Sequence, residues 1–228
     1  MLLIFHNILS FGIAYAGMSF AEYATHRWML HMNTVVGFFP NTQFVKDRLK
    51  DHAVSHHSHF YKCFRREDHP EGKHVGLFIP VSFYVYLLIA VGGPLLFVDW
   101  LTAAYFVAFT VGHYFVWNKF HEVMHFDTLP WYVLVPVSGW WFRFVEYYHF
   151  LHHQHRNKNF NAFLPLWDWL LSTLAEETEL DRLVWRLVNA GEFVDRKGRP
   201  ILTAPAICAA LLENNQPERR LTCSSTIS

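Results

Sequence analysis

Charge and cysteine are both scarce in this chain of 228 residues. Asp, Glu, Lys and Arg together make up 17%, below the roughly 25% that is typical of soluble globular domains. Acidic and basic residues number 19 each, so we expect neither the basic surface that nucleic-acid binding needs nor a nucleic-acid partner. The three cysteines, Cys63, Cys208 and Cys223, lack C-x-x-C spacing, which argues against a disulfide framework and a cysteine-based metal site.

Apolar and aromatic residues are abundant instead, at 52% hydrophobic with 22 Phe, 10 Tyr and 9 Trp. Three apolar segments have about the 20 residues that a membrane helix needs: Leu2–Tyr23, Gly76–Phe97 and Leu101–Trp117. A fourth, Leu129–Val145, contains two prolines and is predicted to be broken or to lie in the membrane interface. The predicted fold class is therefore all-α, an integral membrane helical bundle with three to four membrane helices.

The topology follows from the distribution of basic residues. The loop from Arg27 to Lys73 carries eight of them, whereas the turn Val98–Trp100 carries none, so the long loop is predicted to be cytoplasmic. Ala14-Tyr15-Ala16 resembles a signal-peptide cleavage site, but the basic region that would precede it is missing.

The composition changes after residue 173. Residues 1–173 are predicted to form the membrane domain and residues 174–228 a cytoplasmic tail that is helical in part. Leu180, Leu183, Val184, Leu187 and Val188 recur at the spacing of an amphipathic helix. A short helix is expected at Thr203–Leu212, and the end of the tail is expected to be disordered.

Histidine is the outstanding feature, with 16 residues, of which 12 fall in four clusters. Residues three or four apart share a helix face, so the last two clusters can present imidazoles to a common metal. His26 and His31 are five apart and converge only if the helix ends or kinks between them. The clusters are His26 and His31; His52, His56, His57 and His59; His121 and His125; and His149, His152, His153 and His155.

All four clusters are predicted to lie on the cytoplasmic side of the membrane, because each follows an apolar segment that ends there or belongs to the basic loop. Ten imidazoles exceed what one ion accepts, which predicts two metal ions with roughly five ligands each. Imidazole suits iron, zinc and copper, so the ligand type does not select the metal.

Residues His121-Glu122-Val123-Met124-His125 match the H-E-x-x-H pattern of zinc proteases. A membrane zinc metalloprotease is therefore one alternative, although it leaves the other clusters without a role. A metal transporter is a second alternative. Transport sites usually lie near the bilayer midplane, whereas these histidines gather beyond the helix ends.

The motifs together resemble the histidine boxes of the fatty acid hydroxylase and sterol desaturase superfamily, over residues 2–173. The second box is H-x3-H-H where many members have H-x2-H-H, and Leu171-Ser172-Thr173 stands where Phe-Gly-Thr is common. The stretches that carry the resemblance are EYATHRWMLH (22–31), HAVSHHSHFYK (52–62), HEVMH (121–125) and YYHFLHHQHRNKNFNAFLPLWDWLLST (147–173).

The resemblance implies an O2-dependent membrane di-iron hydroxylase of the endoplasmic reticulum or bacterial inner membrane, acting on a fatty acyl chain, sterol or carotenoid. A lipid desaturase is the alternative within the superfamily. Two iron ions are the expected cofactor, which zinc can replace in a purified form. Electrons are expected from a separate donor of the cytochrome b5 or ferredoxin type, because the chain has no His-Pro-Gly-Gly heme motif.

The predicted ligands are His26, His31, His52, His56, His57, His121, His125, His149, His152 and His153, and no catalytic residue is expected beyond them. Whether His59 or His155 also ligates stays open. Acidic residues are expected to orient such ligands from behind. The candidates are Glu22, Asp51, Glu122, Glu146 and Asp168.

Overall fold

The computed structural model describes residues 1–32, 43–57, 79, 81–125 and 140–190. These residues form helices and no strands, in agreement with the all-α prediction. In chain order the helices are α1 (Leu2–Ala24), the π-helix η1 (Thr25–His31), α3 (Gln43–Leu49), the π-helix η2 (Lys50–His56), α5 (Val81–Leu87), the π-helix η3 (Leu88–Gly92), α6 (Gly93–Val98), α7 (Trp100–His125), α9 (Trp140–Gln154), α10 (Leu166–Leu170) and α11 (Glu179–Ala190).

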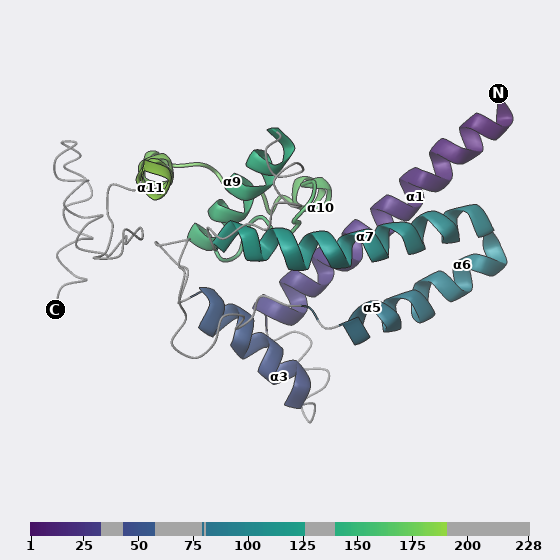
Figure 1. Ribbon diagram of the computed structural model, residues 1–228, viewed down its shortest axis with the longest axis horizontal. Helices are drawn as coiled ribbons and strands as arrows, with labels where there is room; N and C mark the ends of the chain where they lie inside the picture. The colour runs from purple at the N-terminus through teal and green to yellow at the C-terminus, as the bar shows by residue number, and fades with distance from the viewer. Residues whose placement is uncertain (33–42, 58–78, 80, 126–139, 191–228) are drawn as a thin grey trace.

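The long helices α1 and α7 cross each other and form the centre of the molecule (Figure 1). The segments α5, η3 and α6 follow one another and return alongside α7, so that they form a hairpin with it. Where these helices meet, Ala14 and Met18 of α1 pack with Tyr84 of α5 and Phe106 of α7 in a buried apolar cluster. This cluster fixes how the first and third predicted spans lie against each other.

The turn between α6 and α7 is held by Asp99. Its carboxylate accepts hydrogen bonds from the backbone N–H groups of Leu101 and Thr102, which satisfies donors at the start of α7 that have no partner inside the helix. It also accepts a hydrogen bond from the Ser10 hydroxyl at 2.8 Å, which ties the turn to α1. The hydrogen bond from the Thr102 hydroxyl is the main reason that the pKa of Asp99 lies well below its ordinary value.

Two helical stretches are long and apolar enough to cross a membrane: Leu2–His31 and Val81–Val98. Few of their side chains are buried, and Leu2, Phe5 and Ile89 are among the exposed ones. They correspond to the first two predicted spans. The three to four spans of the prediction are not confirmed, because α7 is helical throughout but does not reach the same apolarity. Its second half carries polar residues between Asn118 and His125, which lower its mean hydropathy.

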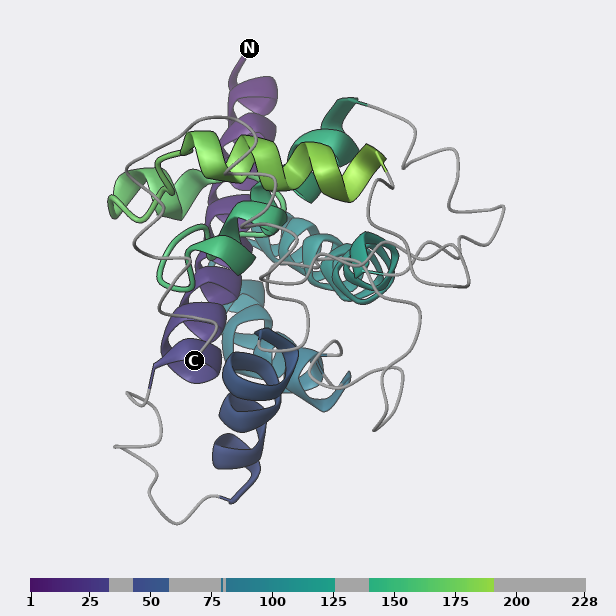
Figure 2. The ribbon, with the colours of Figure 1, turned by 90° about the vertical axis from the view of Figure 1, so that its left-hand side faces the viewer.

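A second layer of helices covers the C-terminal end of α7. Phe120 and Met124 of α7 pack against Phe142 and Phe150 of α9, and Val184 of α11 completes the cluster. Figure 2 shows α11 lying across α9.

Helix α11 lies where the tail sequence predicts an amphipathic helix. The expected helix at Thr203–Leu212 and the expected disordered end lie outside the described residues. Most of the predicted interface segment also lies outside the described residues. Its last residues, 140–145, begin α9.

Candidate metal centre

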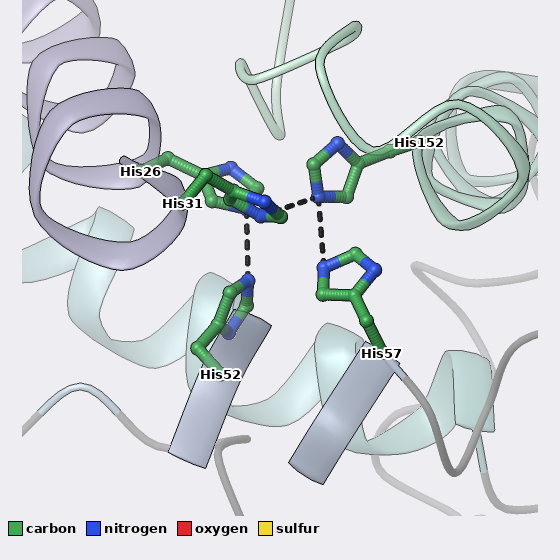
Figure 3. A group of neighbouring side chains, drawn as sticks. All are labelled: His26, His31, His52, His57 and His152. Carbon is green, nitrogen blue, oxygen red and sulfur yellow. Dashed lines mark hydrogen bonds between the residues drawn. The ribbon is translucent and has the colours of Figure 1, made fainter. Parts of the chain in front are cut away.

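All ten predicted ligand histidines come together in the structure, in two adjacent groups of five. Within each group the five candidate ligand nitrogens lie within 4.8 Å of one another. Nine of the ten side chains are buried, and His31 is half-buried. The first histidine group is His26, His31, His52, His57 and His152, and the second histidine group is His56, His121, His125, His149 and His153. Figure 3 shows the first group, whose side chains converge from three separate segments of the chain.

The π-helix η1 explains how His26 and His31 converge although they are five residues apart. Hydrogen bonds in a π-helix join residues five apart, so such residues lie above one another on one face. The ring centroids of His26 and His31 are 5.0 Å apart, and both imidazoles belong to the first histidine group. The kink that the H-x4-H spacing requires is thus a local change of helix type.

The second π-helix, η2, ends at His56, and its two histidines and the following His57 are divided between the two groups. His52 and His57 are five apart and lie together in the first group, with ring centroids 5.0 Å apart. His56 is turned away from them into the second group, where its ring centroid lies 4.8 Å from that of His125. The spacing H-x3-H-H therefore serves both groups at once.

The α-helical boxes follow the ordinary four-residue spacing. His121 and His125 of α7 lie in the second group, and so do His149 and His153 of α9. His152 of α9 belongs to the first group. Helix α9 and η2 thus each supply both groups, and adjacent residues of one segment face different groups.

Two backbone carbonyl oxygens fix which nitrogen of their histidine faces the group. His26 Nδ1 lies 2.7 Å from the Phe160 carbonyl oxygen, and His152 Nδ1 lies 2.6 Å from that of Lys158. A carbonyl oxygen only accepts, so each Nδ1–H donates, and in the neutral ring Nε2 keeps its lone pair. Those Nε2 atoms lie 3.0 Å from His52 Nε2 and 3.1 Å from His31 Nε2, inside the first group. This is the tautomer that metal ligation needs.

The loop that supplies both carbonyl oxygens is itself held by Asp168. The Asp168 carboxylate accepts hydrogen bonds from the backbone N–H groups of Phe160 and Asn161, at 2.9 and 2.6 Å, and from the hydroxyls of Tyr148 and Thr173. Asn159 has φ 56°, a left-handed conformation that asparagine tolerates better than most residues. Asp168 therefore orients His26 through the loop rather than by direct contact.

Glu22 holds the other end of the same loop. Its carboxylate accepts the backbone N–H of Ala162 at 2.7 Å and a hydrogen bond from the Asn161 side chain at 3.2 Å. Since Glu22 lies one helical turn before His26, it fixes α1 against the loop that orients His26. Two of the five predicted carboxylates thus support the first histidine group from behind.

The other candidates have different surroundings. Glu146 is buried and lies 3.2 Å from Arg143 Nη1, while Asp51 and Glu122 are half-buried beside histidines of their own helices. His155 Nε2 lies 3.0 Å from Asp181 Oδ2, so it joins α9 to the start of α11 and belongs to neither group. His59 lies outside the described residues.

Burial keeps the imidazoles of the centre neutral. Desolvation, followed by the effect of neighbouring imidazoles, lowers the pKa of His57, His149 and His153 well below the ordinary value. Burial likewise lowers the pKa of His152 to about 3, although its hydrogen bond to Lys158 opposes the shift. Metal ions bind neutral imidazole, so at neutral pH these side chains have no proton to release before binding. Either group could hold a metal ion.

The prediction missed one buried histidine. His113 of α7 is 5% exposed, and its Nδ1 lies 3.1 Å from the Tyr84 hydroxyl. Its Nε2 lies 3.1 Å from Glu22 Oε1, without the alignment of a hydrogen bond. The one signal in the sequence is that His113, Glu22 and Tyr84 are polar residues within three different apolar segments. No spacing in the sequence indicates that their side chains meet.

Comparisons of the chain with protein-family models, with curated proteins and with solved structures gave no match. The superfamily resemblance therefore depends on the histidine boxes and the residues that follow them, and the function is inferred from the geometry of the site.

Proposed function

We propose that the protein is a membrane-bound di-iron oxygenase that hydroxylates a lipid with O2 and electrons from a separate donor. Desaturation of the same lipid is the alternative outcome of such chemistry. The observation that carries the proposal is the pair of adjacent groups, each of five imidazoles gathered from separate helices into a largely buried centre.

The number of imidazoles in each group suits iron better than zinc in its usual four-coordinate shell, and the distances between neighbouring nitrogens agree with this. Two nitrogens at right angles around an ion at about 2.1 Å are about 3.0 Å apart, whereas tetrahedral ligands are about 3.4 Å apart. The Nε2 atoms of His125 and His149 are 3.1 Å apart, and those of His149 and His153 are 3.2 Å apart. Right-angle spacing and five ligands per group suit a five- or six-coordinate ion, and iron accepts imidazole in such a shell.

Bound iron would supply the redox chemistry with O2. In the overall reaction one oxygen atom enters a C–H bond and the other leaves as water, which consumes two electrons and two protons. The residues of the chain hold the centre in place: the Phe160 and Lys158 carbonyl oxygens fix the tautomers of His26 and His152. Neutral ligands also leave the ions their positive charge, which favours electron delivery.

Exclusion of water is the second contribution of the protein. His56, His57, His125, His152 and His153 are all fully buried. An enclosed centre protects a strong oxidant from unproductive reduction.

The exposed apolar surfaces of Leu2–His31 and Val81–Val98 support a membrane location. A lipid substrate then reaches the centre from the bilayer. We place the centre on the cytoplasmic side of the endoplasmic reticulum or bacterial inner membrane, where a cytochrome b5 or ferredoxin type of donor has access. The basic residues between Arg27 and Lys73 support this orientation.

The arrangement of HEVMH argues against a zinc protease. In a zinc protease His121 and His125 would bind zinc with one further ligand and leave a position for water. Here they share a group with His56, His149 and His153, so the glutamate of the motif is not needed to explain the pair.

The test uses the purified full chain in lipid nanodiscs with iron, a chemical or enzymatic reductant and 18O2. The expected result is one 18O atom in a lipid product, dependent on both O2 and reductant. Product formation without O2 would contradict the proposal. A desaturated product without 18O would assign the alternative outcome.

A further inference from the structure

A cavity of about 150 Å³ lies between α1 and α7, next to the metal centre. Its lining is mainly apolar, with Met18 of α1, Phe109 and Val116 of α7, and Phe163. Apolar cavities with a few convergent polar groups are the usual form of small-molecule sites. Nothing in the proposed metal chemistry requires this cavity.

Three polar side chains converge on the cavity. His113 and Glu22 are both more than nine-tenths buried, and Nε2 of His113 faces Oε1 of Glu22 at 3.1 Å without forming an aligned hydrogen bond. The buried Tyr15 hydroxyl makes no well-aligned hydrogen bond among the described residues, and its polar neighbour is the Ser19 side chain, which also lines the cavity. A buried polar group without a partner costs about 1 to 3 kcal/mol, which a ligand that pairs with it would recover.

The cavity opens on the apolar outer face of α7. Ala108 and Gly112 form part of its lining and are both exposed. A Cβ atom built at Gly112 would meet no other atom within 4 Å, so the space beside this part of the wall is open. The exposed neighbours Val111 and Phe115 are apolar, so the opening faces the side from which a lipid would come.

The inner end of the cavity leads to the second histidine group. Val116 and Phe163 also line a smaller gap of about 20 Å³, whose wall includes His121 and His149. Trp117 continues this connection, because its ring stacks on His113 with centroids 6.0 Å apart and lies 4.9 Å from that of His121. The apolar cavity and the candidate metal centre thus have a common wall.

We propose that this cavity binds a lipid through an uncharged hydroxyl group, which His113, Glu22 and Tyr15 recognise. The inference rests on the proposed function, since it takes the bound lipid to be the substrate. A hydroxyl can donate to the Glu22 carboxylate and accept from His113 or Tyr15. A free carboxylate would be repelled by Glu22 in these buried surroundings.

The rise of α7 gives the scale of the separation between the polar end of the cavity and the second histidine group. His113 and His121 are eight residues apart on α7, which corresponds to a rise of about 12 Å at 1.5 Å per residue. The substrate class that this cavity favours is a lipid alcohol rather than a free fatty acid.

The test uses the purified full chain in nanodiscs under anaerobic conditions, where binding proceeds without turnover. Three probes share one alkyl chain with a photoreactive diazirine and end in a hydroxyl, a carboxylate or an amine. We expect the alcohol to label peptides of α1 and α7 at the cavity, with an affinity at least about tenfold above that of the acid, and we use the amine as a reference that the Glu22 carboxylate does not repel. Equal or tighter labelling by the acid would overturn the proposal.

Two variants test the location. Gly112→Leu fills the cavity from its open wall and should weaken alcohol labelling at least about tenfold. Gly12→Leu is the matched control, because Gly12 lies outside the cavity and a side chain there also meets nothing within 4 Å. Equal labelling of the two variants would place the probe elsewhere. Tyr15→Phe should weaken binding of the alcohol a few-fold and leave binding of the amine unchanged, and no loss would remove Tyr15 from the site.

Binding and oxidation fail separately in this design. Alcohol binding at the cavity with no 18O-labelled lipid under O2 would contradict the proposed function alone. Lipid oxidation with no labelling of the cavity would contradict this inference alone.

Discussion

His26 donates its Nδ1–H to the Phe160 carbonyl oxygen 2.7 Å away, across 134 positions of the sequence. The carbonyl belongs to a loop whose neighbouring N–H groups bind the Asp168 carboxylate. One buried acid therefore controls the orientation of an imidazole that it does not touch.

Changing Asp168 to Asn should weaken metal binding at the first histidine group about 10- to 100-fold, the usual cost of losing a residue that orients a ligand. The amide replaces one of the two acceptor oxygens with a donor, so the backbone N–H of either Phe160 or Asn161 loses its partner. Titration of iron into the purified variant measures the effect. Asp181→Asn is the matched control, because Asp181 is equally buried and hydrogen-bonded but belongs to neither group. Similar iron affinity in both variants would show that Asp168 has no special connection to the metal.

Removing one imidazole from each group in turn should separate the two ions. We expect about two equivalents of iron per chain in the unchanged protein and about one in either His31→Ala or His125→Ala, because each change breaks a different group. Elemental analysis with matched protein quantitation measures this. A variant that keeps both ions, or an active unchanged protein with only one, would contradict two separate metal groups.

The glutamate of HEVMH should matter less than the histidines. Glu122→Gln is expected to lower activity by at most about 10- to 100-fold, whereas His152→Ala or His153→Ala should abolish it. Steady-state rates of lipid oxidation compare the three variants. A dead Glu122 variant beside active His152 and His153 variants would restore the protease interpretation, in which the glutamate activates water.

Chelation of the metal should lower the thermal midpoint by roughly 10 °C, because binding energy at a site formed only in the folded state is folding energy. Differential scanning fluorimetry before and after treatment with a chelator measures the shift. Added Fe2+ should restore the midpoint, and Mg2+ should not, since it prefers oxygen ligands. An unchanged midpoint would mean that the histidine groups hold together without metal.

The sequence was sufficient to name the ten histidines that gather, because their spacings repeat a helical period and a whole cluster is far less ambiguous than one residue. It could not divide them into groups. His56 and His57 are neighbours in the sequence. The change to a π-helix, which ends at His56, brings residues five apart to one face, and for this reason His57 joins His52. Such a change depends on packing between distant segments, which no local pattern records.

The membrane helices could be predicted from the length of the apolar segments, and α11 from the helical spacing of its apolar residues. The number of membrane spans could not, because the apolar first part of α7 runs on into a stretch that mixes polar residues with the apolar Phe120 and Met124, which pack on α9. His113 was missed for a related reason. A single histidine in an apolar segment has no partner in its own sequence neighbourhood, and Glu22 meets it from another helix.

The division of adjacent histidines between the two groups has a consequence for how the centre fills. His56 at the end of η2 and the next residue, His57, belong to different groups, and so do His152 and His153 of α9. An ion in one group immobilises the same two segments that supply the other. The second ion then meets ligands whose conformational entropy has already been lost, and this loss is not paid again. Loading should accordingly be cooperative, with half-filled chains rare and the titration curve of iron steeper than that of two independent sites.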